Sequence, residues 1–326
     1  MDTPSNAGPA GANLNSSSPA PIEPGKSSWR VVWLVVVAAF LALALATPAA
    51  HAAWQQVAQF LSLLGKPVPA SASVLSEHEI EQLDRMSPQA QAMLLLERSI
   101  NHYKGANDQI VARVQQWRGK LKMDGRLNNL FVTALNSDDL RVRAAAIEVD
   151  LAARNLEKTS ATVDRLEPDA YTGEQGPRAN ALWDIGLLGG RGLEPQRAGQ
   201  ILLASVRDPN VNVRYWAVEG LSYLGTDETI APLLGVLHDD PSPMIRERAA
   251  CALAQSGMLS EKQRRTAVPK LLDFADDPAL DGQTRLWVFQ ALRDITGQNI
   301  PHDAAAWRNW YSSNDGRWYP VTHDSQ

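Results

Sequence analysis

Apolar and polar residues alternate with a helical period in residues 208–225, DPNVNVRYWAVEGLSYLG. Counted from Arg214, the positions −1, +3, +4, +7 and +10 are all apolar. They are occupied by Val213, Ala217, Val218, Leu221 and Leu224. Residues at these spacings lie on one face of an α-helix, so the pattern predicts an amphipathic helix with one buried face.

The same pattern recurs along the chain. Residues 240–257, DPSPMIRERAACALAQSG, match the first stretch from the Asp-Pro pair to the final Gly, and weaker copies occupy residues 284–297, 177–189 and 140–154. The copies align on five arginines, Arg143, Arg178, Arg214, Arg246 and Arg285. Successive arginines are 35, 36, 32 and 39 residues apart. A period of this length is typical of stacked supersecondary units and not of one closed core.

A second apolar-periodic segment precedes three of these helices, at residues 195–206, 228–237 and 261–274. Each repeat is therefore expected to be a pair of helices joined by a turn. A single pair of helices cannot bury its apolar face alone. It buries this face by stacking on the next pair.

Glycine occupies the +11 position in three copies, as Gly189, Gly225 and Gly257. These glycines are expected to end their helices in the left-handed conformation, which strains residues that have a side chain. The glycine-rich segment at residues 186–192, GLLGGRG, is expected to be a loop between repeats.

The copies at residues 208–225 and 240–257 resemble bacterial HEAT repeats, including the lyase-like subgroup that also occurs in phycobilin lyases. The resemblance extends over residues 126–311 and is weakest around Arg143, where Asp150 occupies the +7 core position. It implies an all-α fold, a right-handed α-solenoid of helical hairpins with a C-terminal Trp-rich cap. It also implies a structural ladder between neighbouring repeats, formed by turn aspartates and helix arginines. The resemblance assigns this role to Asp208 with Arg214 and to Asp240 with Arg246.

The N-terminal part has a different composition. Residues 1–28 are rich in Pro, Ser, Ala, Gly and Asn, which predicts a disordered cytoplasmic tail. Every residue from 31 to 45 is apolar, so residues 29–53 are expected to be a transmembrane anchor or a signal segment. Lys26 and Arg30 precede the apolar run and no basic residue follows closely, which predicts a cytoplasmic N-terminus.

Two interpretations of this segment remain open. A retained segment would make the chain a single-pass membrane protein, bound to the membrane through its N-terminal helix. Alternatively, Ala50, His51 and Ala52 resemble a signal-peptide cleavage site, and the chain would be secreted after cleavage near Ala52. Both interpretations place the repeat domain in the periplasm or another extracytoplasmic compartment.

The regions next to the repeats are expected to be caps and linkers. Residues 54–75 are predicted to form an amphipathic segment and a linker, and residues 76–125 a helical N-terminal cap region. Ser76 and Glu79 have the spacing of a capping box. Residues 312–326 are predicted to be a tail.

Aromatic residues are concentrated near the C-terminus. Trp307, Trp310 and Tyr311 fall on one side of a short predicted helix that begins after Asp303, and they are expected to seal the last repeat. The alternative is an envelope glycan-binding module formed by Trp307, Trp310, Trp318 and Tyr319.

Composition argues against several functions. The formal net charge is −5 and no basic run occurs, which excludes the positive footprint that nucleic-acid binding needs. The six histidines form no pair at ligand spacing, so neither a metal nor a cofactor is expected, and no catalytic residue is assigned. The single cysteine, Cys251, is expected to be buried apolar filler. A lyase-like enzyme is the less favoured alternative.

One row of residues points to a partner. The +2 position holds Asn180, Trp216, Arg248 and Trp287 in four successive copies, and stacking is expected to align them beside the concave face of the solenoid. Trp and Arg are enriched at interface hot spots. With Tyr215 and Glu247 beside them, these residues predict a non-catalytic scaffold that binds another protein or an extended peptide. The alternative is that the tryptophans pack between repeats.

Overall fold

The computed structural model describes residues 73–172 and 174–314. These residues form helices joined by turns, and the expectation of an all-helical fold is confirmed for them. The predicted tail and the predicted membrane or signal segment lie outside the described residues, as do residues 54–72 and 315–326. None of the described helices is both long enough and apolar enough to cross a bilayer.

The first helices form an N-terminal block with its own hydrophobic core. They are α3 (Glu77–Leu83), α4 (Pro88–Ile100), α5 (Ala106–Trp117) and α6 (Gly125–Leu135). The capping box of Ser76 and Glu79 is present at the start of α3, which confirms that prediction. Trp117 is fully buried and donates its indole N–H to Oε1 of Gln91 at 2.7 Å, so α4 and α5 are joined through a satisfied buried polar contact.

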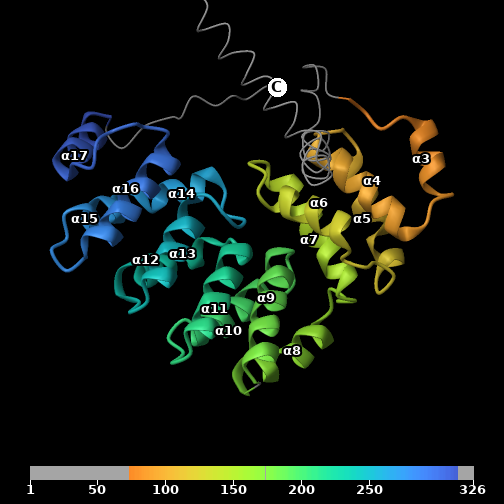
Figure 1. The fold of residues 1–326 in the computed structure, drawn as a ribbon, viewed down its shortest axis with the longest axis horizontal. Helices are drawn as coiled ribbons and strands as arrows, with labels where there is room; N and C mark the ends of the chain where they lie inside the picture. Colours follow the sequence, from red (N-terminus) through yellow and green to blue (C-terminus); the bar gives the residue numbers. More distant parts are fainter. Residues whose placement is uncertain (1–72, 173, 315–326) are drawn as a thin grey trace, which may run out of the picture. The chain divides into compact units, whose positions relative to one another are not determined.

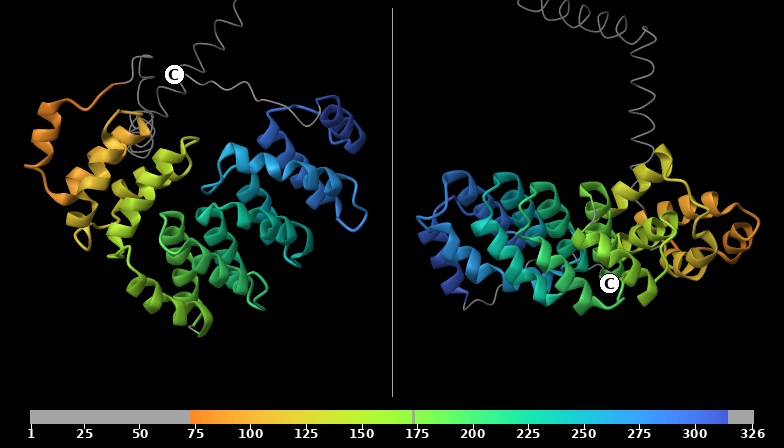
Figure 2. Two further views of the ribbon diagram at one scale, coloured as in Figure 1. Left: turned by 180° about the vertical axis from the view of Figure 1, so that it is seen from behind. Right: turned by 90° about the horizontal axis from the view of Figure 1, so that it is seen from below.

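The following helices alternate between two layers of a stack (Figure 1). One layer contains α7 (Leu140–Ala153), α9 (Gln175–Gly190), α11 (Val211–Leu224), α13 (Pro243–Ala254) and α16 (Gly282–Thr296). The other contains α8 (Ser160–Thr172), α10 (Pro195–Ser205), α12 (Ile230–Asp239) and α15 (Val268–Ala275). Short helices η1 (Asp227–Thr229) and α14 (Glu261–Thr266) precede α12 and α15, and α17 (Ala304–Ser313) follows α16. Figure 2 shows the stacked helices in chain order from two further directions.

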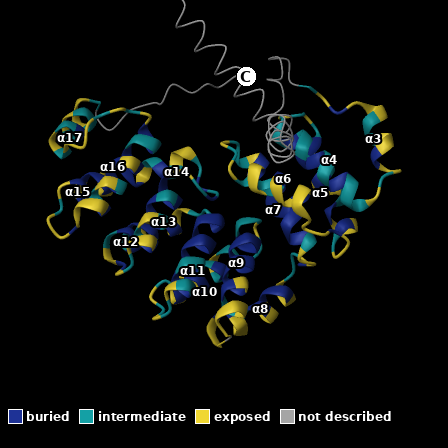
Figure 3. Ribbon diagram, viewed as in Figure 1, coloured by how far each residue is buried: buried dark blue, intermediate teal, exposed yellow. Residues whose placement is uncertain are grey.

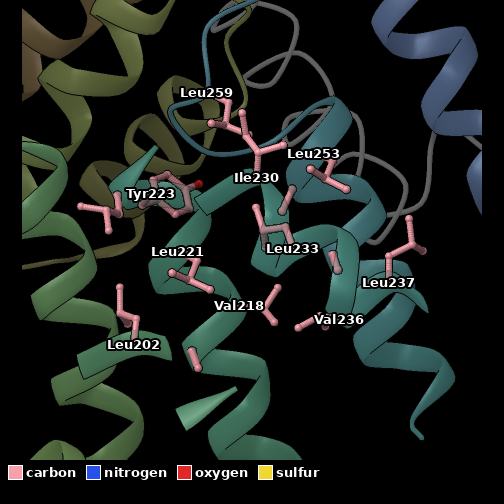
Figure 4. Close-up of a cluster of buried hydrophobic side chains, with 14 of the residues drawn as sticks. Leu202, Val218, Leu221, Tyr223, Ile230, Leu233, Val236, Leu237, Leu253 and Leu259 are labelled. Carbon is pink, nitrogen blue, oxygen red and sulfur yellow. The ribbon is translucent and has the colours of Figure 1, made fainter. Parts of the chain in front are cut away.

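The predicted apolar faces form the core of this stack. Val213, Ala217, Val218, Leu221 and Leu224 are each at most 4% exposed, which confirms the face assigned to α11. In Figure 4, Val218 and Leu221 lie among side chains of α10, α12 and α13. Buried residues are accordingly concentrated within the stack in Figure 3, because each hairpin covers the face of its neighbour.

Helices α9 and α11 cross at two glycines. A Cβ placed on Gly186 would lie 2.5 Å from Cα of Gly220, and one on Gly220 would lie 2.8 Å from the carbonyl oxygen of Leu182. Helix α9 continues to Gly190, so the segment at residues 186–192 is mostly helical. The prediction that this segment is a loop was wrong. Its glycines allow two helix backbones to approach, a requirement that depends on a partner helix more than thirty residues away.

The helix ends agree with the glycine prediction in one of three copies. Gly225 is the left-handed C-cap of α11, with a φ value of +61°. Gly257 is also left-handed, with a φ value of +74°, but α13 ends earlier, with Gln255 as its C-cap. Gly189 is different, because α9 continues through Gly190. A Cβ on Gly189 would lie 2.7 Å from Cβ of Ala198. Glycine is therefore needed here for close packing and not for a left-handed backbone.

Arginines of the second helices bind aspartates of the following repeat. Nε and Nη2 of Arg214 donate to the two carboxylate oxygens of Asp240 at 2.8 and 3.1 Å. Arg178 binds Asp208 at 2.6 Å, and Arg246 binds Asp281 at 2.8 Å. Each arginine therefore binds the aspartate side chain of the following repeat. The expected pairs within one repeat, Asp208 with Arg214 and Asp240 with Arg246, contact each other through the aspartate backbone carbonyl.

Within its own repeat each of these arginines reaches a backbone carbonyl. Nη1 of Arg214 donates to the carbonyl of Asp208 at 2.9 Å, and Nη1 of Arg246 donates to that of Asp240 at 2.7 Å. One guanidinium therefore fixes the turn before its helix and also the next hairpin.

The C-terminal helix covers the end of the stack. Trp307 is fully buried, and its indole N–H donates to the carbonyl of Pro301 at 3.0 Å. Trp310 and Tyr311 are half-buried and pack against the same core. Asp303 caps α17 as predicted, by accepting from the amides of Ala305 and Ala306. Trp318 and Tyr319 lie outside the described residues.

The crossing of α9 and α11 gives a stability prediction. We expect Gly186→Ala to lower the free energy of unfolding by about 1–3 kcal/mol, because the new methyl group meets backbone atoms of α11 that cannot move aside. Gly235→Ala in α12 is the matched control, since a Cβ there meets no atom within 4 Å. It should stabilise by up to about 1 kcal/mol through helix propensity. Urea unfolding of both variants checks the pair, and a neutral Gly186→Ala would contradict the close approach.

The ladder gives a second prediction. Asp240→Ala leaves Arg214, which is 8% exposed, as a buried cation without its carboxylate, and should cost about 3 kcal/mol or more. Asp281→Ala should cost only about 1 kcal/mol for a lost helix cap, because the Asp281 side chain is 52% exposed. Equal losses in thermal or urea unfolding would show that burial does not control the strength of the ladder.

Candidate functional site

The predicted +2 row is divided by the structure. Asn180 is exposed, whereas Trp216 and Trp287 are half-buried and pack against the core. The Trp216 ring makes edge-on contacts with Trp183 of α9 at 5.8 Å and with the neighbouring Tyr215 at 5.5 Å between ring centroids. Trp216 thus takes part in packing between α9 and α11, which is the alternative role considered for the tryptophans.

Arg248, the third member of this row, is held by a neighbouring repeat. Nη2 of Arg248 donates to Oε2 of Glu219 at 3.0 Å and to Oγ of Ser256 at 2.8 Å, and its Nε donates to Oε1 of Glu219. Burial opposes the charge of Arg248, but the Glu219 carboxylate outweighs burial and raises the pKa of the guanidinium. Arg248 is therefore a charged group whose orientation is fixed.

Arg248 lines a polar pocket of about 760 Å³, which we call the central pocket. Its wall also includes Tyr215, Glu219 and Tyr223 of α11 and Cys251 of α13. Of the six predicted partner-binding residues, Tyr215 and Arg248 line the central pocket. Asn180, Trp216, Glu247 and Trp287 do not line it, and Glu247 is exposed.

The central pocket is closed by a segment that is distant in sequence. Asn136, Asp138 and Arg143, in and after the turn between α6 and α7, line it together with residues of α11, α13 and α14. Nη1 of Arg143 donates to the carbonyl of Gly257 at 2.6 Å, across 114 positions of sequence. The weakest repeat copy therefore contributes an arginine to the site, at a place where other copies form the ladder.

The polar wall of the central pocket comes from one particular face of the second helices. Counted from the repeat arginines, the polar wall positions are +1, +5 and +9 on α11, +2 and +5 on α13, +9 at the C-cap of α13, and +9 on α16. This face is centred roughly 60° around the helix from the predicted +2 row. A polar and aromatic stripe at +1, +5 and +9, Tyr215, Glu219 and Tyr223, was the sequence signal that could have found it.

Tyrosine and cysteine side chains contribute to the wall in different ways. Burial and the nearby Glu219 carboxylate raise the pKa of both Tyr215 and Tyr223 to about 12, so both hydroxyls remain neutral donors. Cys251 is half-buried and lines the pocket, so the expectation of a buried filler was wrong. The reason is that +5 of α13 faces the pocket and not the next helix.

A second pocket, also of about 760 Å³, lies between α10 and α12. Its charged walls include Asp208, Arg214 and Asp240, which already bind one another or Arg178 in the ladder. The remaining wall includes Leu203, Val206 and Pro232. Arg207 and Asp239 also line it, and Asp239 is bound to His238.

Two buried carboxylates lie between α7 and α9. Asp150 is 2% exposed and accepts from Nε of Arg154 at 2.9 Å and from the indole N–H of Trp183 at 3.3 Å. Asp184 is 7% exposed, and no group in residues 73–172 and 174–314 donates a hydrogen bond to its Oδ1. Neither carboxylate lines the central pocket. No group of three metal-ligating side chains occurs in the described part of the chain.

Comparison with known families identifies the repeated units. The HEAT repeats family matches residues 173–254 and, in a second overlapping register, residues 199–293. Residues 173–293 contain HEAT repeats. No curated protein matches the chain. The matched HEAT repeats begin after the Arg143 copy, in which a buried Asp150 replaces the apolar +7 residue.

The HEAT repeat that contains Asp184 should show a distinct pH dependence. Burial, together with the repulsion of Asp150, raises the pKa of Asp184 from 3.8 to about 7 although Arg154 opposes the shift. The folded state then keeps a proton that the unfolded chain releases above about pH 4, so this group makes stability fall as pH rises from about 4 to about 7.

Asp184→Asn removes this titrating group and its contribution to the pH dependence of stability. We expect the variant to be more stable than the native chain by a few kcal/mol at pH 8, with a difference that shrinks toward pH 4. Urea unfolding across this pH range measures the difference directly. Asp108→Asn on α5, whose side chain is exposed, is the control and should show no such trend. A constant difference across the range would contradict a raised pKa at Asp184.

Proposed function

We propose that the chain is a non-catalytic platform that binds another protein or an extended peptide through its HEAT repeats. The observation that supports it most is the central pocket, because it joins Tyr215, Tyr223 and Arg248 from successive repeats on one face. HEAT repeats are protein-interaction scaffolds in general, and their extended concave surfaces are the usual binding sites. Tyrosine and arginine are also the residue types that dominate interface energies.

The described residues favour this proposal over the alternatives. Glycan binding by the C-terminal aromatics would need Trp307, whose ring is fully buried and whose N–H is already bound to Pro301. The two buried aspartates of α7 and α9 lie away from the central pocket, so they do not supply it with a catalytic carboxylate.

We further propose that the platform works in the cell envelope. The support is the apolar run at residues 31–45, which follows Lys26 and Arg30 and would orient the repeats away from the cytoplasm. Residues 29–53 would then act as a retained anchor, or as a signal segment that is cleaved near Ala52.

Truncation of Tyr215 tests the platform. Crosslinking in intact cells, followed by purification and quantitative mass spectrometry, should capture a specific partner with the native chain. Tyr215→Ala should reduce that capture by about fivefold or more, the effect of losing an aromatic hot spot. Tyr171→Ala, on the exposed surface of α8, is the matched control and should leave capture unchanged.

Folding is checked in parallel by circular dichroism and melting temperature. If a folded Tyr215→Ala chain captures the same partners in the same amounts as the native chain, the central pocket is not the binding surface. Recovery of the repeats from the cytoplasmic fraction would separately overturn the proposed location.

A further inference from the structure

Two buried arginines of the central pocket form no direct ion pair within the described residues. Arg143 and Arg264 are 5% and 8% exposed, and no carboxylate of residues 73–172 and 174–314 lies within ion-pair distance of either. By contrast, the buried Arg214 is paired with Asp240, and the half-buried Arg248 is paired with Glu219. Buried cations are normally paired because burial removes the solvation of the charge, so this exception calls for a physical explanation.

Both guanidinium groups are fixed by neutral backbone carbonyls. Arg143 donates from Nε to the carbonyl of Ser137 at 2.5 Å and from Nη1 to that of Gly257 at 2.6 Å. Within the described chain no acceptor is bonded to its Nη2. Arg264 donates to four carbonyls at the end of α13 and in the following turn, at 2.8 to 3.2 Å. Carbonyls orient the two side chains without neutralising them. The Asp138 carboxylate favours the charged form of Arg143 from a distance but makes no ion pair with it.

The two charges also influence each other. Burial lowers the pKa of Arg143, and burial together with the positive charge of Arg143 lowers the pKa of Arg264 to about 10. Both side chains line the central pocket. An anion placed between them would cancel the repulsion and would gain charge-assisted hydrogen bonds from an arginine that is already oriented.

The acidic residues of the same wall restrict the kind of anion. Glu219 is bound to Arg248, and Glu261 is bound to Arg265. Asp138 and Asp294 also line the pocket, and no described cation forms an ion pair with either. These two carboxylates would repel a dianion such as phosphate, whereas a single carboxylate with a cation nearby would match both parts of the wall.

We propose that the central pocket binds the carboxylate of a peptide segment at Arg143 and Arg264, with a basic group of the same segment beside Asp138 or Asp294. This assignment rests on the proposed platform function and specifies the chemistry of its partner. The carboxylate is the terminal one or that of an acidic side chain, and both present the same planar pair of oxygens to a guanidinium.

A pair of model peptides tests the site with the full-length chain in detergent. The probes are acetyl-Lys-Leu with a free C-terminal carboxylate and the same peptide with a C-terminal amide. Cys251 lines the pocket and is the single cysteine of the chain, so its alkylation by iodoacetamide reports occupancy of this pocket alone. Affinities come from calorimetry.

The carboxylate peptide should slow alkylation of Cys251 and bind at least about tenfold more tightly than the amide, a difference of about 1.4 kcal/mol. Both effects should weaken with added salt, as expected for a charge interaction. Arg143→Gln should remove the preference for the carboxylate. Arg285→Gln is the matched control, because Arg285 holds the same repeat position as Arg143 but does not line the pocket.

Several results would overturn the assignment. Equal affinity of the native chain for the two peptides, or no binding of either near 1 mM, would do so without any variant. Stronger protection of Cys251 by inorganic phosphate than by the peptide would replace the carboxylate with a phosphate. Capture of the cellular partner separates the two proposals. If Tyr215→Ala loses the partner and Arg143→Gln keeps it, the platform stands and the carboxylate site is wrong.

Discussion

The whole stack depends on the burial of one apolar helix face against the next hairpin. A single HEAT hairpin exposes this face, so the free energy of the fold comes largely from contacts between repeats. Side chains such as Val218 and Leu221 are fully buried only because α10, α12 and α13 surround them. The same constraint explains why α9 and α11 meet at Gly186 and Gly220, where side chains would hold the helices apart.

Buried charge separates the scaffold from the site. In the ladder every arginine finds an aspartate of the next repeat, and the pair fixes the spacing of the hairpins. At the central pocket the repeat arginine Arg143 has no such aspartate and bonds to the carbonyl of Gly257 instead. The arginine position that pairs with an aspartate in three copies therefore makes no direct ion pair in the copy that lines the pocket, and this is where the proposed carboxylate would bind.

Departures from the repeat pattern coincide with the chemistry of the molecule. Asp150 breaks the apolar face of α7, and its buried carboxylate lies near Asp184 between α7 and α9. Cys251 and Tyr215 occupy a helix face that the apolar periodicity leaves unassigned, and that face forms the pocket wall. In each repeat, packing constrains only the apolar face of the helix. The adjacent face can therefore differ from repeat to repeat and form a distinct binding surface.

The sequence by itself determined the helical hairpins, their period and their buried faces, because these follow from local spacing of apolar residues and from caps such as Ser76 and Asp303. Tertiary structure decided which residues meet. No local pattern distinguishes Gly189 in a tight helix contact from Gly225 in a C-cap, or gives the rotation that turns Tyr215 rather than Trp287 toward the pocket. The approach of Arg143 to Gly257 depends on the orientation of every intervening hairpin. These orientations are set only when the whole stack packs.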